Sequence, residues 1–271
     1  MKDIVENRQR ISLGSKLRLA LISIRSNGPV WFIFLGIYYL GSAVSDFGFR
    51  RADMLRKKKN LPGMNSRSAN KVIWESWDWS GKGDEWTISP EWKASVVRNF
   101  IDPYYRDCDK LLEIGPGAGR WTEFLVTKAK KFIGIDISET CVLECRKRFS
   151  SFSNAEFEVG NGQDLAMIAT SSVDGIWSFD VFVHINSDEF LSYTKEFRRV
   201  LKPGGVVIIH HGSVGGSQGG WRSNMTIAMA HEFMTASGLE VEKQLQTWLD
   251  AGTEYPAGLY SDTITIARKP A

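Results

Sequence analysis

The sequence predicts an α/β domain with a mostly parallel sheet covered by helices on both faces, preceded by a basic and apolar N-terminal arm. From residue 110 onward, short apolar runs alternate with amphipathic stretches, and a glycine-rich turn follows the first run. Strands that alternate with helices form parallel sheets. Charge separates the arm from the domain: residues 1–70 carry 13 Lys and Arg against 4 Asp and Glu, whereas residues 71–271 carry 21 against 27.

The strands and helices of the domain are expected in a regular order. Apolar runs predict strands at residues 110–114, 131–135, 156–159, 173–178, 206–210, 239–246 and 263–267. Amphipathic stretches predict helices at residues 121–129, 139–149, 187–201 and 224–237. Pro203, Gly204 and Gly205 end the longest helix and turn the chain into the next strand. The last two strands are close in sequence, which favours an antiparallel pair at one edge of the sheet.

The arm, residues 1–50, contains 20 consecutive residues without a charged side chain, residues 26–45. A helix of that length is about 30 Å long, enough to cross a bilayer core. More Lys and Arg follow this segment than precede it, so its C-terminal flank is expected on the cytoplasmic side of a membrane. Two other interpretations stay open, a signal peptide and a helix packed on the domain or on a partner subunit. Nucleic-acid binding is not expected, because phosphate contacts do not require an uncharged block.

Residues 51–71 are expected to link the arm to a domain at residues 72–271, which begins with a tryptophan-rich cap at residues 72–109. Five tryptophans lie within 19 residues of the cap, at positions 74, 77, 79, 86 and 92. Their indoles are expected to cover the sheet edge, to line a ligand site, or to do both. Three cysteines, Cys108, Cys141 and Cys145, are too few for a disulfide framework and fit a reducing compartment.

The strongest chemical signal is the glycine turn, residues 115–119, which follows the first strand. Glycine lets the backbone turn tightly and approach a ligand closely. Dinucleotide enzymes use a similar turn, but here the spacing is Gly-x-Gly-x-Gly, with Arg120 where their third glycine belongs. Asp136, at the end of the second strand, can accept hydrogen bonds from both hydroxyls of an adenosine ribose.

At these residues the sequence resembles the class I S-adenosylmethionine-dependent methyltransferases, over about residues 86–271. Four segments carry the resemblance in order: residues 111–120, 133–137, 160–165 and 199–205. The resemblance implies a Rossmann-like, seven-stranded sheet whose last strand is antiparallel. It also implies S-adenosyl-L-methionine as the cofactor and transfer of its sulfonium methyl group to a nucleophile.

The resemblance implies a contact residue for each part of the cofactor. The glycine turn would lie against the methionine part, Asp136 on the ribose and Asp164 on the adenine amino group, with a helix N-cap as the alternative role of Asp164. Ile137 and Leu165 would flank the adenine, and Glu113 would orient the cofactor amino group directly or through water. The complete set of cofactor-binding candidates is Glu113, Gly115, Gly117, Gly119, Asp136, Ile137, Asp164, Leu165 and Ser178.

The acceptor is expected at the C-terminal ends of the fourth and fifth strands, where open α/β sheets bind ligands. His184 and His211 are the candidate catalytic bases, and the alternative is that one of them only orders a loop. Adjacent strand residues face opposite ways, so at most one of His210 and His211 points into the crevice. Asp180 is the third catalytic candidate; it orients an imidazole, binds a divalent ion with the histidines, or is structural. No metal site is assigned.

The segment from residue 210 to 223 is rich in glycine and polar residues, which is typical of a mobile lid. Trp221 and Arg222 in this segment are expected to stack on and hydrogen-bond a polyhydroxylated acceptor.

These features together predict a membrane-associated O-methyltransferase for a sugar, a glycolipid or a related lipid-linked small molecule. Its catalytic domain is expected on the cytoplasmic side of the membrane, whether the arm spans the bilayer or lies on it. The alternative enzyme is an N- or C-methyltransferase for an amine or quinone-type acceptor. The second alternative is a binding protein that keeps the fold without catalysis.

Overall fold

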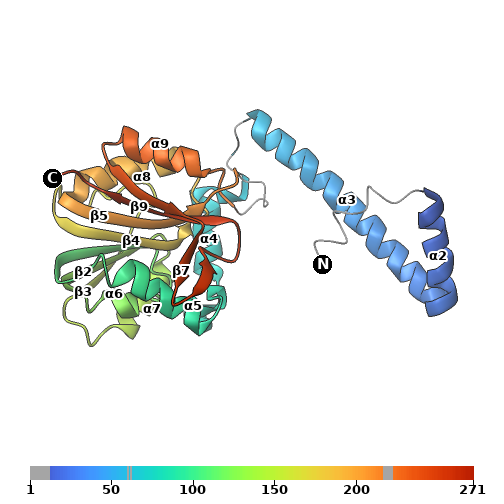
Figure 1. Ribbon diagram of the computed structural model, residues 1–271, viewed down its shortest axis with the longest axis horizontal. Coiled ribbons are helices and arrows are strands. Elements are labelled where there is room, and N and C mark those ends of the chain that lie inside the picture. The colour runs from blue at the N-terminus through green and yellow to red at the C-terminus, as the bar shows by residue number, and fades with distance from the viewer. Residues whose placement is uncertain (1–12, 60, 62, 216–221) are drawn as a thin grey trace. The chain divides into compact units, whose positions relative to one another are not determined.

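The computed structural model describes residues 13–59, 61, 63–215 and 222–271 in two units, Met1–Leu61 and Pro62–Ala271 (Figure 1). Residues 216–221 of the predicted lid, including Trp221, lie outside the described residues, and so do the first 12 residues of the arm. The two units are described separately.

The N-terminal unit consists of two helices, α2 (Leu13–Asn27) and α3 (Pro29–Lys59). Gly28, with a φ of +83°, separates them, and Pro29 begins α3 with a backbone angle suited to a helix start. Within the described residues, α3 alone is long and apolar enough to cross a membrane, and it has no buried residue. The helix includes residues 51–59 of the predicted linker, where the Asp53 side chain bonds Arg56 and Lys57 one turn ahead.

The second unit contains a seven-stranded sheet in the order β3-β2-β1-β4-β5-β9-β6. Six strands run in one direction, and β9 is antiparallel to both of its neighbours, β5 and β6. This confirms the seven-stranded, mostly parallel sheet. Its strands are β1 (Cys108–Ile114), β2 (Ala129–Asp136), β3 (Ala155–Val159), β4 (Val173–Phe182), β5 (Leu201–Gly212), β6 (Glu240–Leu245) and β9 (Asp262–Arg268).

Helices cover both faces of the sheet (Figure 1). One face packs against α5 (Pro90–Val96), α6 (Thr122–Leu125) and α7 (Glu139–Arg148), and the other against α8 (Ser187–Val200) and α9 (Ile227–Ala236). Neighbouring residues of β1 point to opposite faces, so Leu111 lies in one apolar core and Leu112 in the other. Before the sheet, the cap contains α4 (Arg67–Ser76) and the short helical turns Trp79–Gly81 and Asp84–Trp86.

Two local features differ from the sequence prediction. The helix expected at residues 121–129 is only the short α6, and residues 247–256 form an additional hairpin of β7 (Thr247–Asp250) and β8 (Thr253–Pro256). Tertiary contacts explain the hairpin: Trp248 packs edge-on to Phe100 at 4.9 Å, and its indole N–H donates to the Ser95 hydroxyl. The sequence pattern of this short segment does not contain that information.

Candidate active site

A cavity of about 550 Å³ lies beside the C-terminal ends of β1, β2 and β4 in the second unit. Its lining comes from the glycine turn, the cap, the loops after β3 and β4, and residues 258–262 before β9. All five tryptophans expected in the cap line it: Trp74, Trp77, Trp79, Trp86 and Trp92. Such a mostly enclosed site at the strand ends is where this type of sheet binds ligands.

The glycine turn forms one wall of the cavity. Gly115 and Gly117 have φ angles of +69° and +57°, which favour glycine. A Cβ atom on Gly117 would lie 2.9 Å from Trp79 Cζ3, and one on Gly115 would lie 2.2 Å from Val181 Cγ2. Gly119 does not line the cavity, because it packs against Phe149 instead. The turn therefore presents bare backbone to the cavity, and the cap lies directly on it.

Asp136 ends β2 beside this wall, with its carboxylate held by backbone N–H groups. Its Oδ2 accepts from Gly117 N at 3.1 Å and its Oδ1 from Ser138 N at 2.9 Å. Burial raises the pKa of Asp136 to about 6, although these N–H groups favour the ionised form. The neighbouring Ile137 also lines the cavity, so both predicted residues of this segment reach it.

Glu113 and Ser178 support the turn from behind rather than lining the cavity. Glu113 accepts a hydrogen bond from the Thr122 hydroxyl at 2.5 Å, and Ser178 donates its hydroxyl to the Ile114 carbonyl at 2.8 Å. Burial raises the pKa of Glu113 to about 8, and the nearby Asp136 charge adds to the rise. Contact of either side chain with a cofactor stays a prediction.

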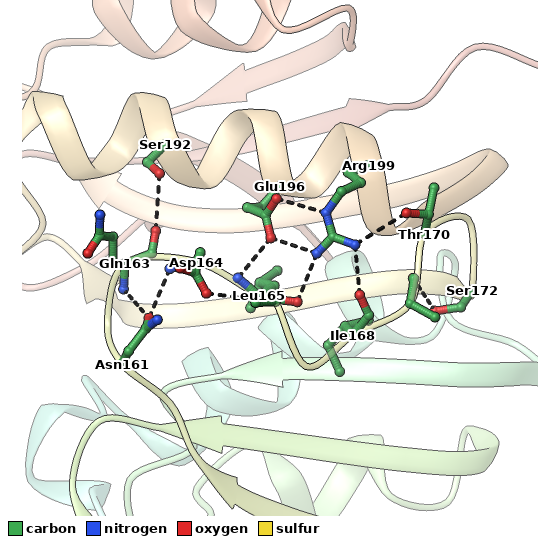
Figure 2. Close-up of polar contacts among 12 residues, drawn as sticks. Asn161, Gln163, Asp164, Leu165, Ile168, Thr170, Ser172, Ser192, Glu196 and Arg199 are labelled. Atoms are coloured by element: carbon green, nitrogen blue, oxygen red, sulfur yellow. Dashed lines mark hydrogen bonds and ion pairs between the residues drawn. The ribbon is translucent and has the colours of Figure 1, made fainter.

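The loop after β3 is held by its own side chains and by residues of α8 (Figure 2). Asp164 is half-buried and accepts from the backbone N–H of Ala166, whereas Asn161 accepts from the backbone of Gln163 and Asp164. These bonds stabilise a turn and do not cap a helix, because no helix lies in the fully described segment between β3 and β4. Contact of Asp164 with adenine stays a prediction.

Leu165 is a buried residue of this loop, and side chains of α8 hold its backbone (Figure 2). Glu196 accepts from Leu165 N at 2.9 Å, and Arg199 donates to its carbonyl at 2.8 Å. Neither Asp164 nor Leu165 lines the cavity, whereas Gly160 and Gly162 do. Gly160 and Gly162 are not among the predicted cofactor-binding residues, although two glycines on either side of Asn161 indicate a turn that can approach a ligand closely.

Asp180 is turned into the opposite end of the cavity by an unusual backbone. Its φ is +61°, at a shift in the β4–β5 register between Ser178 and Phe182. A strained conformation in a non-glycine residue is typical of functional sites. Its carboxylate pairs with Arg120, and its Oδ1 lies 3.0 Å from His210 Nδ1. Burial alone would raise the pKa of Asp180, but the charges of Arg120 and His210 hold it well below the usual range.

The three histidines near the site have different surroundings. His184 lines the cavity beside the Trp74 ring, at 5.3 Å between ring centroids. His211 does not line it: its two ring nitrogens lie 2.8 Å from the Gly212 carbonyl and 2.7 Å from Thr265 Oγ1, and burial lowers its pKa to about 4. His210 is turned toward Asp180, stacked on Phe179 at 4.3 Å.

Residues 111–205 match the family model described as a methyltransferase domain. Residues 111–205 therefore belong to a methyltransferase domain, and the second unit has the class I methyltransferase fold. An uncharacterised methyltransferase of Oceanobacillus iheyensis is 31% identical over 100 residues, which are 37% of this chain and 45% of the relative. A Mycolicibacterium smegmatis protein named as an S-adenosylmethionine-dependent methyltransferase is 32% identical over 36% of each chain. The match therefore spans less than half of each relative.

Solved methyltransferase structures share the fold of this domain. N-methyltransferase NodS from Bradyrhizobium japonicum, in complex with S-adenosyl-L-homocysteine, superposes with a TM-score of 0.59 at 15% identity, over 76% of this chain and 99% of NodS. A chain from the complex of the Haloferax volcanii Trm112 methyltransferase activator with a methyltransferase gives 0.57 at 20% identity, over 73% of this chain and 98% of that one. At these identities the likeness concerns the fold.

Arg222, Tyr260 and Asp262 line the same cavity as Asp180. Arg222 pairs with Asp262, and its guanidinium lies 4.8 Å from the centre of the Tyr260 ring. Asp262 Oδ2 in turn lies 3.5 Å from His210 Nε2. Sequence analysis missed Tyr260 and Asp262, which lie far along the chain from any motif. Among the described residues, no group of three or more His, Cys, Asp or Glu is arranged to hold a metal ion.

Proposed function

We propose that this protein is an S-adenosylmethionine-dependent O-methyltransferase for a hydroxyl of a sugar, a glycolipid or a related lipid-linked small molecule. The observation that carries the proposal is Asp180, whose ionised carboxylate is turned by a left-handed backbone into the same cavity as the glycine turn. A carboxylate there can accept the proton of a hydroxyl acceptor.

The residues at the other end of the cavity fit the cofactor. Gly117 lines the cavity without a side chain, and Asp136 offers a carboxylate beside it for the ribose hydroxyls. Gly160, Gly162 and Ile137 supply a narrow apolar wall suited to the adenine. S-adenosylmethionine, when bound, supplies an activated methyl group for in-line displacement.

In this mechanism the protein aligns the acceptor and removes its proton. Asp180 accepts a hydrogen bond from the acceptor hydroxyl and takes its proton as the new C–O bond forms. Arg120 fixes the orientation of the Asp180 carboxylate through their ion pair, and His210, 3.0 Å away, shares the proton with it. Burial lowers the pKa of His210, which keeps its ring neutral and able to receive a proton, and Asp262 Oδ2 lies 3.5 Å from its Nε2.

The cap supports a polyhydroxylated acceptor. Four tryptophans of the cap line the cavity: Trp74, Trp77, Trp79 and Trp86. Where two of these rings are in contact, their centroids are 5.4–6.1 Å apart. Flat aromatic rings pack against the C–H faces of a sugar, while charged pairs such as Arg222–Asp262 bind its hydroxyls.

An amine acceptor is the second candidate, because an anionic carboxylate among tryptophan rings also suits an ammonium group. The ion pair between Arg120 and Asp180 disfavours it, because the neighbouring guanidinium repels an ammonium group. Asp180 gives no support to a quinone-type acceptor, because methyl transfer to a carbon needs no carboxylate in that position.

We further propose that α3 associates the protein with a membrane, with the methyltransferase domain on the cytoplasmic side. The helix exposes large apolar residues along its first half, such as Phe34 (67%) and Leu40 (68%), and ends in the basic run Arg56, Lys57, Lys58 and Lys59. Basic residues next to an apolar helix favour the cytoplasmic side and anionic headgroups. Deletion of residues 1–59 should move the protein from the membrane fraction to the supernatant, and continued membrane recovery would contradict this role.

The test of the catalytic proposal is transfer of a labelled methyl group by the full-length protein in detergent. The acceptor panel contains monosaccharides, glycolipids, amines and quinols, and the products are identified by mass spectrometry. A methyl ether formed on a sugar or glycolipid supports the proposal. Products only on nitrogen or carbon would establish the second candidate, and cofactor binding without any transfer would favour a non-catalytic binding protein.

A further inference from the structure

Two adjacent side chains after the glycine turn, Arg120 and Trp121, have buried N–H groups without an acceptor. Arg120 is 5% exposed and Trp121 3% exposed, and both line the cavity. Arg120 Nη1 and Trp121 Nε1 make no hydrogen bond. A buried donor without a partner destabilises the folded protein, so folded proteins keep few of them.

Nearby indoles with the same chemistry do have acceptors within the protein. Trp92, whose ring centre is 6.0 Å from that of Trp121, donates its N–H to the Pro256 carbonyl at 2.8 Å. Trp248 donates to the Ser95 hydroxyl at 2.8 Å. Trp177 also lacks an acceptor, but its side chain does not line the cavity. The open donors on the cavity wall are therefore available to a ligand.

The guanidinium of Arg120 is held in a fixed position that leaves one edge open. Its Nη2 pairs with Asp180, and its central carbon lies 5.0 Å from the centre of the Trp121 ring. Two N–H donors from side chains that line the same cavity can bind the oxygens of a carboxylate, and bonds to a charged acceptor are stronger than bonds to a neutral one.

We propose that Arg120 Nη1 and Trp121 Nε1 form a carboxylate-binding subsite of the cavity. The inference rests on the proposed function, since that function gives two sources of a carboxylate: the methionine part of the cofactor and an acidic acceptor such as a uronic acid. The position of both residues directly after the glycine turn is compatible with either source.

Calorimetric titration of the full-length protein with S-adenosylhomocysteine and with 5′-methylthioadenosine separates the two sources, because only the first ligand has a carboxylate. If the cofactor occupies the subsite, Trp121→Phe should weaken S-adenosylhomocysteine binding about tenfold and leave 5′-methylthioadenosine unchanged. Arg120→Lys, which keeps a cation near Asp180, should show the same selectivity. If an acceptor occupies it, these variants should instead lose binding of glucuronate, but not of glucose, to the protein saturated with S-adenosylhomocysteine.

Thermal unfolding distinguishes a ligand-binding role from a structural one. Trp121→Phe and its matched control Trp248→Phe lose the same ring volume. Trp121→Phe removes a donor that has no partner, so without ligand it should melt at a higher temperature than the control. The control removes a bonded indole N–H away from the cavity and should bind S-adenosylhomocysteine as the wild type does.

Two results would overturn the proposal. Variants at both positions that bind all four ligands like the wild type would show that there is no carboxylate subsite, while the proposed function stands. Wild-type protein that binds neither adenosyl ligand would remove the proposed function and the subsite together.

Discussion

The two ends of the cavity are built in different ways. The cofactor end consists mainly of backbone: a glycine turn, the end of β2 and the loop after β3, with Asp136 as its principal charged group. The proposed acceptor end consists of side chains from the cap, from β4 and from residues 222 and 258–262, joined through ion pairs that include Arg120–Asp180 and Arg222–Asp262. A short local motif specifies the first end, whereas only tertiary structure specifies the second.

The largest effect is expected from Asp180→Asn at the acceptor end. Loss of the carboxylate should lower the methyl-transfer rate about 10²-fold or more, because an amide cannot take the acceptor proton. Affinity for S-adenosylhomocysteine should not fall. Steady-state kinetics and calorimetry on the same preparation check both parts, and a normal rate would remove Asp180 from the mechanism.

The reverse pattern is expected from Asp136→Ala at the cofactor end. Loss of two hydrogen bonds to a charged group should weaken S-adenosylhomocysteine binding about 100-fold, with an unchanged circular-dichroism spectrum. An affinity within a factor of two of the wild type would show that Asp136 does not hold the ribose. Together these two variants test whether the ends of the cavity are functionally separate.

The pH dependence of cofactor binding should follow Asp136, because burial raises its pKa to about 6. The carboxyl must be ionised to accept both ribose hydroxyls, so affinity should fall about tenfold for each pH unit below this value. In the unliganded protein the raised pKa of Asp136 has the opposite pH dependence. It stabilises the folded protein fully at low pH, where the carboxyl is protonated, and this stabilisation is lost as the pH rises through about 6. Titrations between pH 5 and 8 measure the first effect, and affinity independent of pH would exclude it.

The smallest effect is expected from the two histidines that the sequence nominates as bases. His184→Ala should lower the transfer rate about tenfold, since His184 lines the cavity beside Trp74. His211→Ala should lower the melting temperature with little change in rate, because His211 is buried and bonded away from the cavity. A large loss of rate in His211→Ala, with stability unchanged, would reverse this ranking.

Sequence reasoning predicts the fold and the cofactor end well because both depend on local signals. The alternation of strands and helices gives the sheet, and the positions of Gly115, Gly117 and Asp136 on successive strand ends give one wall of the cavity. The acceptor end was harder to predict from the sequence. The register shift near Asp180 and the pairing of β5 with β9 determine that His210, rather than His211, is turned toward Asp180. Asp262 and Tyr260 belong to no motif and reach the cavity only through the fold.

The most direct test of the central claim is calorimetric titration of the full-length protein with S-adenosylmethionine and, in parallel, with a nicotinamide dinucleotide. The glycine turn without a third dinucleotide-type glycine, together with Asp136, predicts one-to-one binding of S-adenosylmethionine and no binding of the dinucleotide. Selective binding of the dinucleotide, or binding of neither ligand, would contradict the assignment of the cavity to methyl transfer.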